Sequence, residues 1–172
     1  MKNILNIILL LVCTVTYSQR ITFEEVLALK NKDEIKIKEY LVGNGWEILH
    51  EHYSKKYKFG DIRFAYDNKN PDREIPLFIK YFHREKKLTN NILEFEVCKK
   101  EIFDDYLAQF KLLDYVLIDT KADSNQTIET YKNATATILI KIFPVENYFG
   151  RKQTFYTFVI KDNNFKEKKI KN

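Results

Sequence analysis

The sequence predicts an α+β protein in which two tandem α-β-β-β-β units form one curved antiparallel sheet of about eight strands, with the helices on one face. Three observations support this fold class. The spacing of apolar residues changes from helical to alternating at the only tryptophan, Trp46. An amphipathic helix then separates two sets of four strand-like runs. The second set repeats the first in the same order.

The first 18 residues have the form of a signal peptide. Lys2 is followed by an apolar run from Ile4 to Val12 and then by small and hydroxyl residues. The run is too short to span a bilayer, which needs about 20 apolar residues. We therefore expect cleavage after Ser18, export to the periplasm or the extracellular space, and no stable membrane anchor. Lipid attachment at Cys13 is the alternative, although lipoprotein processing prefers a smaller residue than Val12 before the cysteine. The leader resembles those of exported proteins from flavobacteria and their relatives.

Residues 19–165 are expected to form a single domain of two similar units, about 22–98 and 99–165, followed by a basic tail, 166–172. A chain of this length can bury enough apolar surface to fold without disulfides, and Cys98 is predicted to be a small buried strand residue. Without Lys2, 28 basic residues stand against 24 acidic ones, and the tail supplies three of the four excess positive charges. Because this excess is not a patch on a folded face, no nucleic-acid partner is predicted.

The first unit begins with two predicted helices. Thr22 and Glu25 form a capping box for a short helix, and Asn31 with Glu34 three residues later provides a second start signal. The segment Gly43-Asn44-Gly45 ends the second helix, because glycine tolerates a positive φ. Four strand-like runs follow, WEILHEHY, DIRFAYD, IPLFIKYF and ILEFEVC.

The second unit begins with the clearest helix of the chain, KKEIFDDYLAQFKLLD at residues 99–114, whose apolar side chains share one stripe. Four runs then repeat those of the first unit. YVLIDT stands where WEILHE stood, TIETYKN echoes IRFAYDN, TILIKIF echoes PLFIKYF, and TFYTFVIK echoes NILEFEVC. Because one four-stranded sheet would have two open edges and a thin core, the two units are expected to join into one sheet.

This order of elements resembles that of the β-lactamase inhibitor protein family, which also uses tandem α/β units and turns a sheet face to its partner. The resemblance covers most of the chain after the leader but rests on element order alone. It implies a binding face and no individual functional residue.

No motif for catalysis or for a cofactor is identifiable in the sequence. The four glycines form no phosphate-binding loop, and neither Ser54 nor Ser124 lies in a Gly-x-Ser-x-Gly elbow. His50 and His52 project from one face of a strand, as zinc ligands can, but His83, the only other histidine, is predicted two strands away. Exposed surface histidines are the simpler interpretation, so we assign no metal ligand, no catalytic residue and no cofactor.

Aromatic residues provide the remaining functional signal. Tyr and Phe supply 24 residues, and runs such as FIKYF place apolar side chains on both faces of a strand. A sheet face without helices is normally polar, so an aromatic outer face indicates binding, unless loops or the first helix cover it. Burying an unpaired ammonium is costly, and this predicts an outward set of Phe78, Lys80 and Phe82, with Leu139, Lys141 and Phe143 as counterparts.

The sequence therefore favours an exported, non-catalytic module that binds another protein or an envelope component through its sheet face. The alternative is a small-ligand carrier or a hydrolase with a pocket between the two units. An open aromatic face supports the first interpretation, and an enclosed pocket lined by convergent polar groups supports the second.

Overall fold

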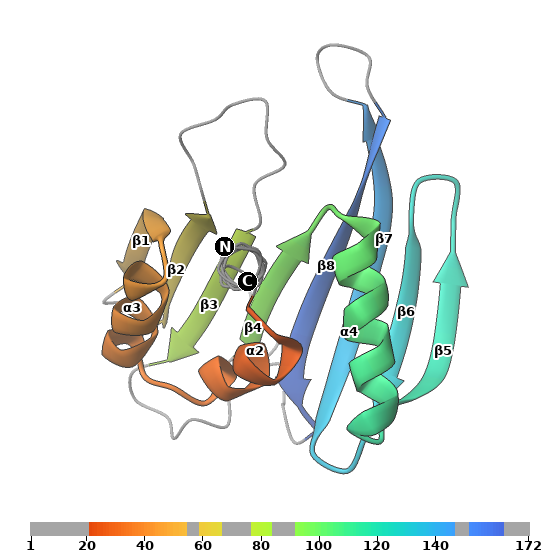
Figure 1. Ribbon diagram of the computed structural model, residues 1–172, viewed down its shortest axis with the longest axis horizontal. Helices are drawn as coiled ribbons and strands as arrows, with labels where there is room; N and C mark the ends of the chain where they lie inside the picture. Colours follow the sequence, from red (N-terminus) through yellow and green to blue (C-terminus); the bar gives the residue numbers. More distant parts are fainter. Residues whose placement is uncertain (1–20, 55–58, 67–76, 84–91, 147–151, 164–172) are drawn as a thin grey trace, which may run out of the picture.

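The computed structural model describes residues 21–54, 59–66, 77–83, 92–146 and 152–163. Within these residues it has an α+β fold, with three helices and one antiparallel sheet of eight strands in the order β1-β2-β3-β4-β8-β7-β6-β5 (Figure 1). The predicted signal peptide at 1–18 and the basic tail at 166–172 lie outside the described residues.

In each unit four antiparallel strands follow the helical part, as the sequence predicted, with two described helices in the first unit and one in the second. The first contains α2 (Phe23–Lys30), α3 (Glu34–Gly43), β1 (Trp46–Ser54), β2 (Phe59–Tyr66), β3 (Leu77–His83) and β4 (Ile92–Val97). The second contains α4 (Lys100–Leu112), β5 (Val116–Ala122), β6 (Thr127–Lys132), β7 (Ala136–Glu146) and β8 (Lys152–Asp162).

The ends of the first two helices follow local capping rules. The capping box is confirmed, since the Thr22 side chain accepts from the Glu25 backbone N–H and the Glu25 carboxylate accepts from the Thr22 backbone N–H. The second helix is capped by Asp33, which accepts from the backbone N–H of Lys36, so the prediction that Asn31 starts it is wrong. Asn31 instead ends α2.

The two units join through their fourth strands at the centre of the sheet. β4 pairs with β8 in an antiparallel ladder in which Phe95 lies opposite Phe158. The flanking pairs are Leu93 with Ile160 and Val97 with Tyr156. A pseudo-twofold axis that relates the two units passes between the two phenylalanines. It makes each residue of β4 equivalent to the residue of β8 that lies 63 positions later in the chain.

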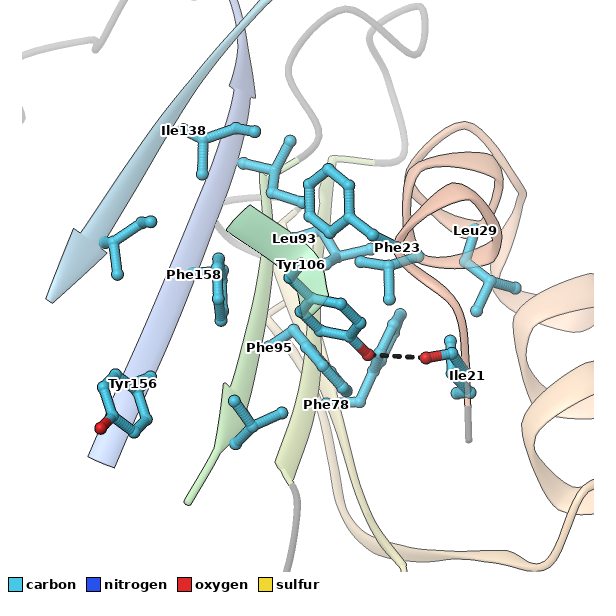
Figure 2. Close-up of a cluster of buried hydrophobic side chains, with 14 of the residues drawn as sticks. Ile21, Phe23, Leu29, Phe78, Leu93, Phe95, Tyr106, Ile138, Tyr156 and Phe158 are labelled. Atoms are coloured by element: carbon cyan, nitrogen blue, oxygen red, sulfur yellow. Dashed lines mark hydrogen bonds between the residues drawn. The ribbon is translucent and has the colours of Figure 1, made fainter. Parts of the chain in front are cut away.

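All three described helices lie on one face of the sheet, where a single hydrophobic core spans both units (Figure 1). Phe23 of α2 lies within 4.7 Å of Phe110 of α4 and 6.3 Å of Phe158 of β8, measured between ring centroids. The hydroxyl of Tyr106 donates to the carbonyl oxygen of Ile21 at 2.6 Å, so α4 also anchors the chain before α2 (Figure 2).

Both edge strands are interrupted by a β-bulge. The bulge in β1 lies between Ile48 and His50, and that in β5 lies between Leu117 and Asp119. A bulge leaves one residue unpaired and increases the local twist, so each edge strand is divided into two short regular stretches.

Candidate binding face

The register of the ladders decides which side chains share a face of the sheet. Phe64, Phe78, Phe95, Phe158 and Ile140 form one continuous row across five strands. They are at most 3% exposed and lie on the side of the helices. Since side chains alternate along a strand, their neighbours in sequence lie on the opposite side, which we call the uncovered face because no described helix packs on it.

The first-unit half of the predicted outward set is wrong. Phe78 is fully buried, Lys80 is 2% exposed, and Phe82 packs against the core beneath the helices. The reason is that the Lys80 ammonium is not unpaired there. It donates a hydrogen bond to the carbonyl oxygen of Lys30, the last residue of α2, where the helix dipole also favours a positive charge.

An ion pair between Lys30 and Asp162 continues this polar cluster. The ammonium of Lys30 donates to the carboxylate of Asp162 on β8 and is itself 5% exposed. Burial, and to a smaller extent the charge of Lys30, lowers the pKa of Lys80 to about 7, while Asp162 acts in the opposite direction. The cluster therefore links α2 to β3 of the first unit and to β8 of the second. The Lys80 amine is almost inaccessible to solvent.

The second-unit half of the set does lie on the uncovered face. Leu139, Lys141 and Phe143 alternate with Ile138, Ile140 and Ile142, which are buried in the core or packed against it. Matching PLFIKYF with TILIKIF aligns Phe78 with Leu139. In the structure Phe78 is instead equivalent to Ile140. Phe78 lies opposite Phe95 of β4, Ile140 lies opposite Phe158 of β8, and these two phenylalanines are equivalent in the two units. A shift of one residue in a strand exchanges the two faces.

The first-unit side chains that take these positions on the uncovered face are Leu77, Ile79 and Tyr81, of which Ile79 is only 5% exposed. Each lies beside an uncovered-face residue of β4 or β2, as in the pair of Ile79 with Glu94. The equivalence of Phe95 and Phe158, present in the aligned runs NILEFEVC and TFYTFVIK, is the signal that could have set the correct register.

Two stacked aromatic pairs lie on the uncovered face, one in each unit. Phe59 stacks on Tyr81 with ring centroids 6.1 Å apart and an interplanar angle of 20°. Phe143 stacks on Phe155 at 5.8 Å and 14°. These four rings are only partly buried or exposed, whereas the rings of the opposite face fill the core. Of these four rings, only Phe143 belongs to the outward set predicted from the sequence.

Charged groups occupy the centre of the uncovered face. Glu94 and Glu96 project from β4, and the Glu96 carboxylate accepts from the Thr157 hydroxyl of β8 at 3.0 Å. The pKa of Glu96 is raised, chiefly by burial. The hydrogen bond from Thr157 lowers this pKa, and the charge of Glu94 adds to the rise. Lys141 lies opposite Thr157 on the far side of β8. The face thus places carboxylates and an ammonium between its two aromatic pairs.

The histidines do not form a metal site within the described residues. The rings of His50 and His52 lie parallel with centroids 6.3 Å apart, and Nδ1 of His52 is 3.9 Å from the Asp61 carboxylate. Asp61 also accepts from Nε of Arg63 at 3.1 Å. β2 separates their strand from that of His83. No group of three or more His, Cys, Asp or Glu residues in the described ranges could hold a metal ion.

Comparisons with protein-family models, with curated proteins and with solved structures returned no match. In the part of the chain that the structure describes, no helix is both long enough and apolar enough to cross a membrane. The uncovered face brings stacked rings, aliphatic side chains and charged groups together on one sheet.

Proposed function

We propose that this protein is an exported, non-catalytic binding module that holds a partner protein or an envelope component on its uncovered face. The observation that carries this proposal is the pair of aromatic stacks, Phe59 with Tyr81 and Phe143 with Phe155, on the side of the sheet that no described helix covers. Aromatic side chains are enriched at protein interfaces.

The geometry supports a binding site that is formed before the partner arrives. The stacked rings project from neighbouring strands inside a continuous sheet, so their positions are set by backbone ladders and not by loops. Preorganisation reduces the entropy lost on association. Burial of the apolar part of this face contributes about 25 cal/mol per Å² before association costs are subtracted.

The space between the two units offers less support for a carrier or a hydrolase. On the helix side, Phe95, Phe158 and Tyr106 pack together at the junction and are at most 3% exposed. The described side chains at this junction therefore fill the region where the alternative function needs a pocket.

A capture experiment with a face variant tests the proposal. The bait is the chain from Gln19 to Asn172 on a support, and the variant combines Tyr81→Ser with Phe143→Ser. The matched control is Ile35→Ser, which removes a side chain that is 68% exposed on α3. We expect envelope components that bind the wild type and the control to be lost from the face variant, with unchanged circular dichroism. Equal capture by all three baits would contradict the proposal.

Export is tested by a separate measurement. A cleaved leader predicts that the intact mass of the protein outside the cytoplasm corresponds to a chain that begins at Gln19. A chain that retains Met1, or a lipid on Cys13, would contradict this part of the proposal.

A further inference from the structure

β5 is the most exposed strand among those that the structure describes. All seven of its residues are exposed, and it forms one edge of the sheet. Three consecutive aliphatic side chains, Val116, Leu117 and Ile118, are 61%, 52% and 56% exposed. An edge strand presents unpaired backbone N–H and C=O groups, and apolar side chains on it favour pairing with another strand.

The bulge leaves a regular stretch of β5 available for such pairing. From Asp119 onward the register against β6 is continuous, with Asp119 opposite Thr130 and Ala122 opposite Thr127. Thr120 is near the middle of this stretch. Asp119 and Lys121 flank it on the uncovered face, where their carboxylate oxygen and ammonium nitrogen are 3.4 Å apart.

A lysine on an edge strand normally discourages pairing, but here the charges of the strand complement one another. In an antiparallel pair centred on Thr120, Asp119 of each copy lies directly opposite Lys121 of the other copy. Opposite charges in directly opposed positions stabilise a strand pair, and like charges destabilise it.

We propose that two copies of this protein associate through their β5 strands, antiparallel and centred on Thr120. The twofold axis is perpendicular to the sheet, so the sheet continues from one copy into the other and both uncovered faces lie on the same side. This dimer goes beyond the proposed binding function and does not depend on it.

The other edge strand lacks this complementarity. Antiparallel pairing of two β1 strands about Glu51 would place His50 of each copy opposite His52 of the other, so no residues of opposite charge would face each other across the axis. Glu51 also accepts a hydrogen bond at 2.9 Å from the ammonium of Lys38. The Lys38 side chain of α3 therefore lies against this part of β1. The charges therefore favour β5 as the edge that meets a second copy.

Charge-reversal variants test the register by sedimentation velocity of the chain from Gln19 onward over a range of concentrations. We expect the wild type to form a concentration-dependent dimer. Asp119→Lys and Lys121→Asp should each weaken the dimer about tenfold or more, since two attractive cross-strand pairs become repulsive. An equimolar mixture of the two variants should restore association, because all opposed charges are then complementary. Glu39→Lys, an exposed change on α3, is the control and should leave the dimer unchanged.

A disulfide across the twofold axis provides a second, independent measurement. Directly opposed residues of antiparallel strands have Cα atoms about 4.5–5.5 Å apart, within disulfide range. In a Cys98→Ser background, Thr120→Cys should form a covalent dimer on mild oxidation, and Thr130→Cys on β6 should not. Any of four results would overturn the proposal: a wild type that stays monomeric, single variants that dimerise like the wild type, a mixture that fails to associate, or species larger than a dimer.

Discussion

Lys80 is the least exposed of the charged residues that the structure describes, at 2%. Its ammonium lies in the core, bound to the carbonyl that ends α2 and close to the ion pair of Lys30 with Asp162. The cation is satisfied by one hydrogen bond and by the helix dipole, but it is removed from water and near a second cation. The lowered pKa follows from these two costs.

Stability should therefore increase with pH between about 7 and 9.5. In this range the unfolded chain keeps Lys80 protonated, since its unfolded pKa is near 10.5, whereas the folded chain has lost that proton. The unfolded state binds more protons, so the free energy of unfolding rises by up to about 1.4 kcal/mol per pH unit. Below pH 7 both states are protonated and the full cost of burying the charge remains.

Replacing Lys80 by Met should flatten this dependence, because a neutral side chain of similar length binds no proton. Urea unfolding at several pH values measures the slope. Lys141→Met, on the uncovered face, is the matched control and should keep the wild-type slope. A slope that persists in Lys80→Met would show that another group controls stability in this range.

At the scale of elements, β3 and β7 show how one residue of register decides the role of a strand. Their sequences are alike, FIKYF and LIKIF, yet the lysine of β3 faces the helices and that of β7 faces away. The ammonium of Lys80 on β3 donates to the carbonyl oxygen of Lys30, the last residue of α2. In β7 the equivalent position is Ile142, which packs against the core.

Two phenylalanines that the sequence comparison assigned to one face should respond differently to replacement by serine. Phe78→Ser is expected to lower the free energy of unfolding by about 3–5 kcal/mol, because it opens a cavity among Trp46, Phe64 and Phe95. Phe143→Ser should lower it by about 1 kcal/mol, since it removes one partner of a surface stack. Urea unfolding of both variants measures the difference. Similar losses for the two would contradict the assignment of faces.

At the scale of the whole molecule, the two units share one core and one central ladder. Phe23 of the first unit packs against Phe110 and Phe158 of the second, and Tyr106 holds the backbone at Ile21. Neither unit could leave the other without exposing these side chains, so they are expected to unfold together.

Unfolding should therefore be a single cooperative transition. Trp46 is the only tryptophan and belongs to the first unit, where it packs against Tyr66, Phe78 and Phe95. Its fluorescence reports on that unit, while far-ultraviolet circular dichroism reports on the whole chain. Coincident urea transitions by the two probes are expected, and separated midpoints would show that the units are independent.

Local features made most of the fold predictable. The capping box at Thr22, the change of period at Trp46 and the stripe of α4 each depend on residues a few positions apart. The repeated order of four runs after a helix then indicated one sheet of two units. The helix start at Asn31 was wrong because Asp33, two residues later, competes for the same role.

The candidate face could be predicted only in part. Alternation in β7 placed Leu139, Lys141 and Phe143 together correctly. The same rule failed for β3, because it assumed that an inward lysine would have no partner. That partner is a backbone carbonyl 50 residues away in the chain, and no local pattern indicates it.

The sequence by itself determined the type and order of the elements, since helix caps, periodicity and turn residues act over short distances. Only the tertiary structure decided that β4 meets β8, that Lys80 is buried and that Tyr81 lies beside Phe59 on the open side. These outcomes depend on which distant groups supply hydrogen bonds and apolar contacts. In a strand, where a shift of one residue exchanges the two faces, such contacts determine which side chains are left to bind a partner.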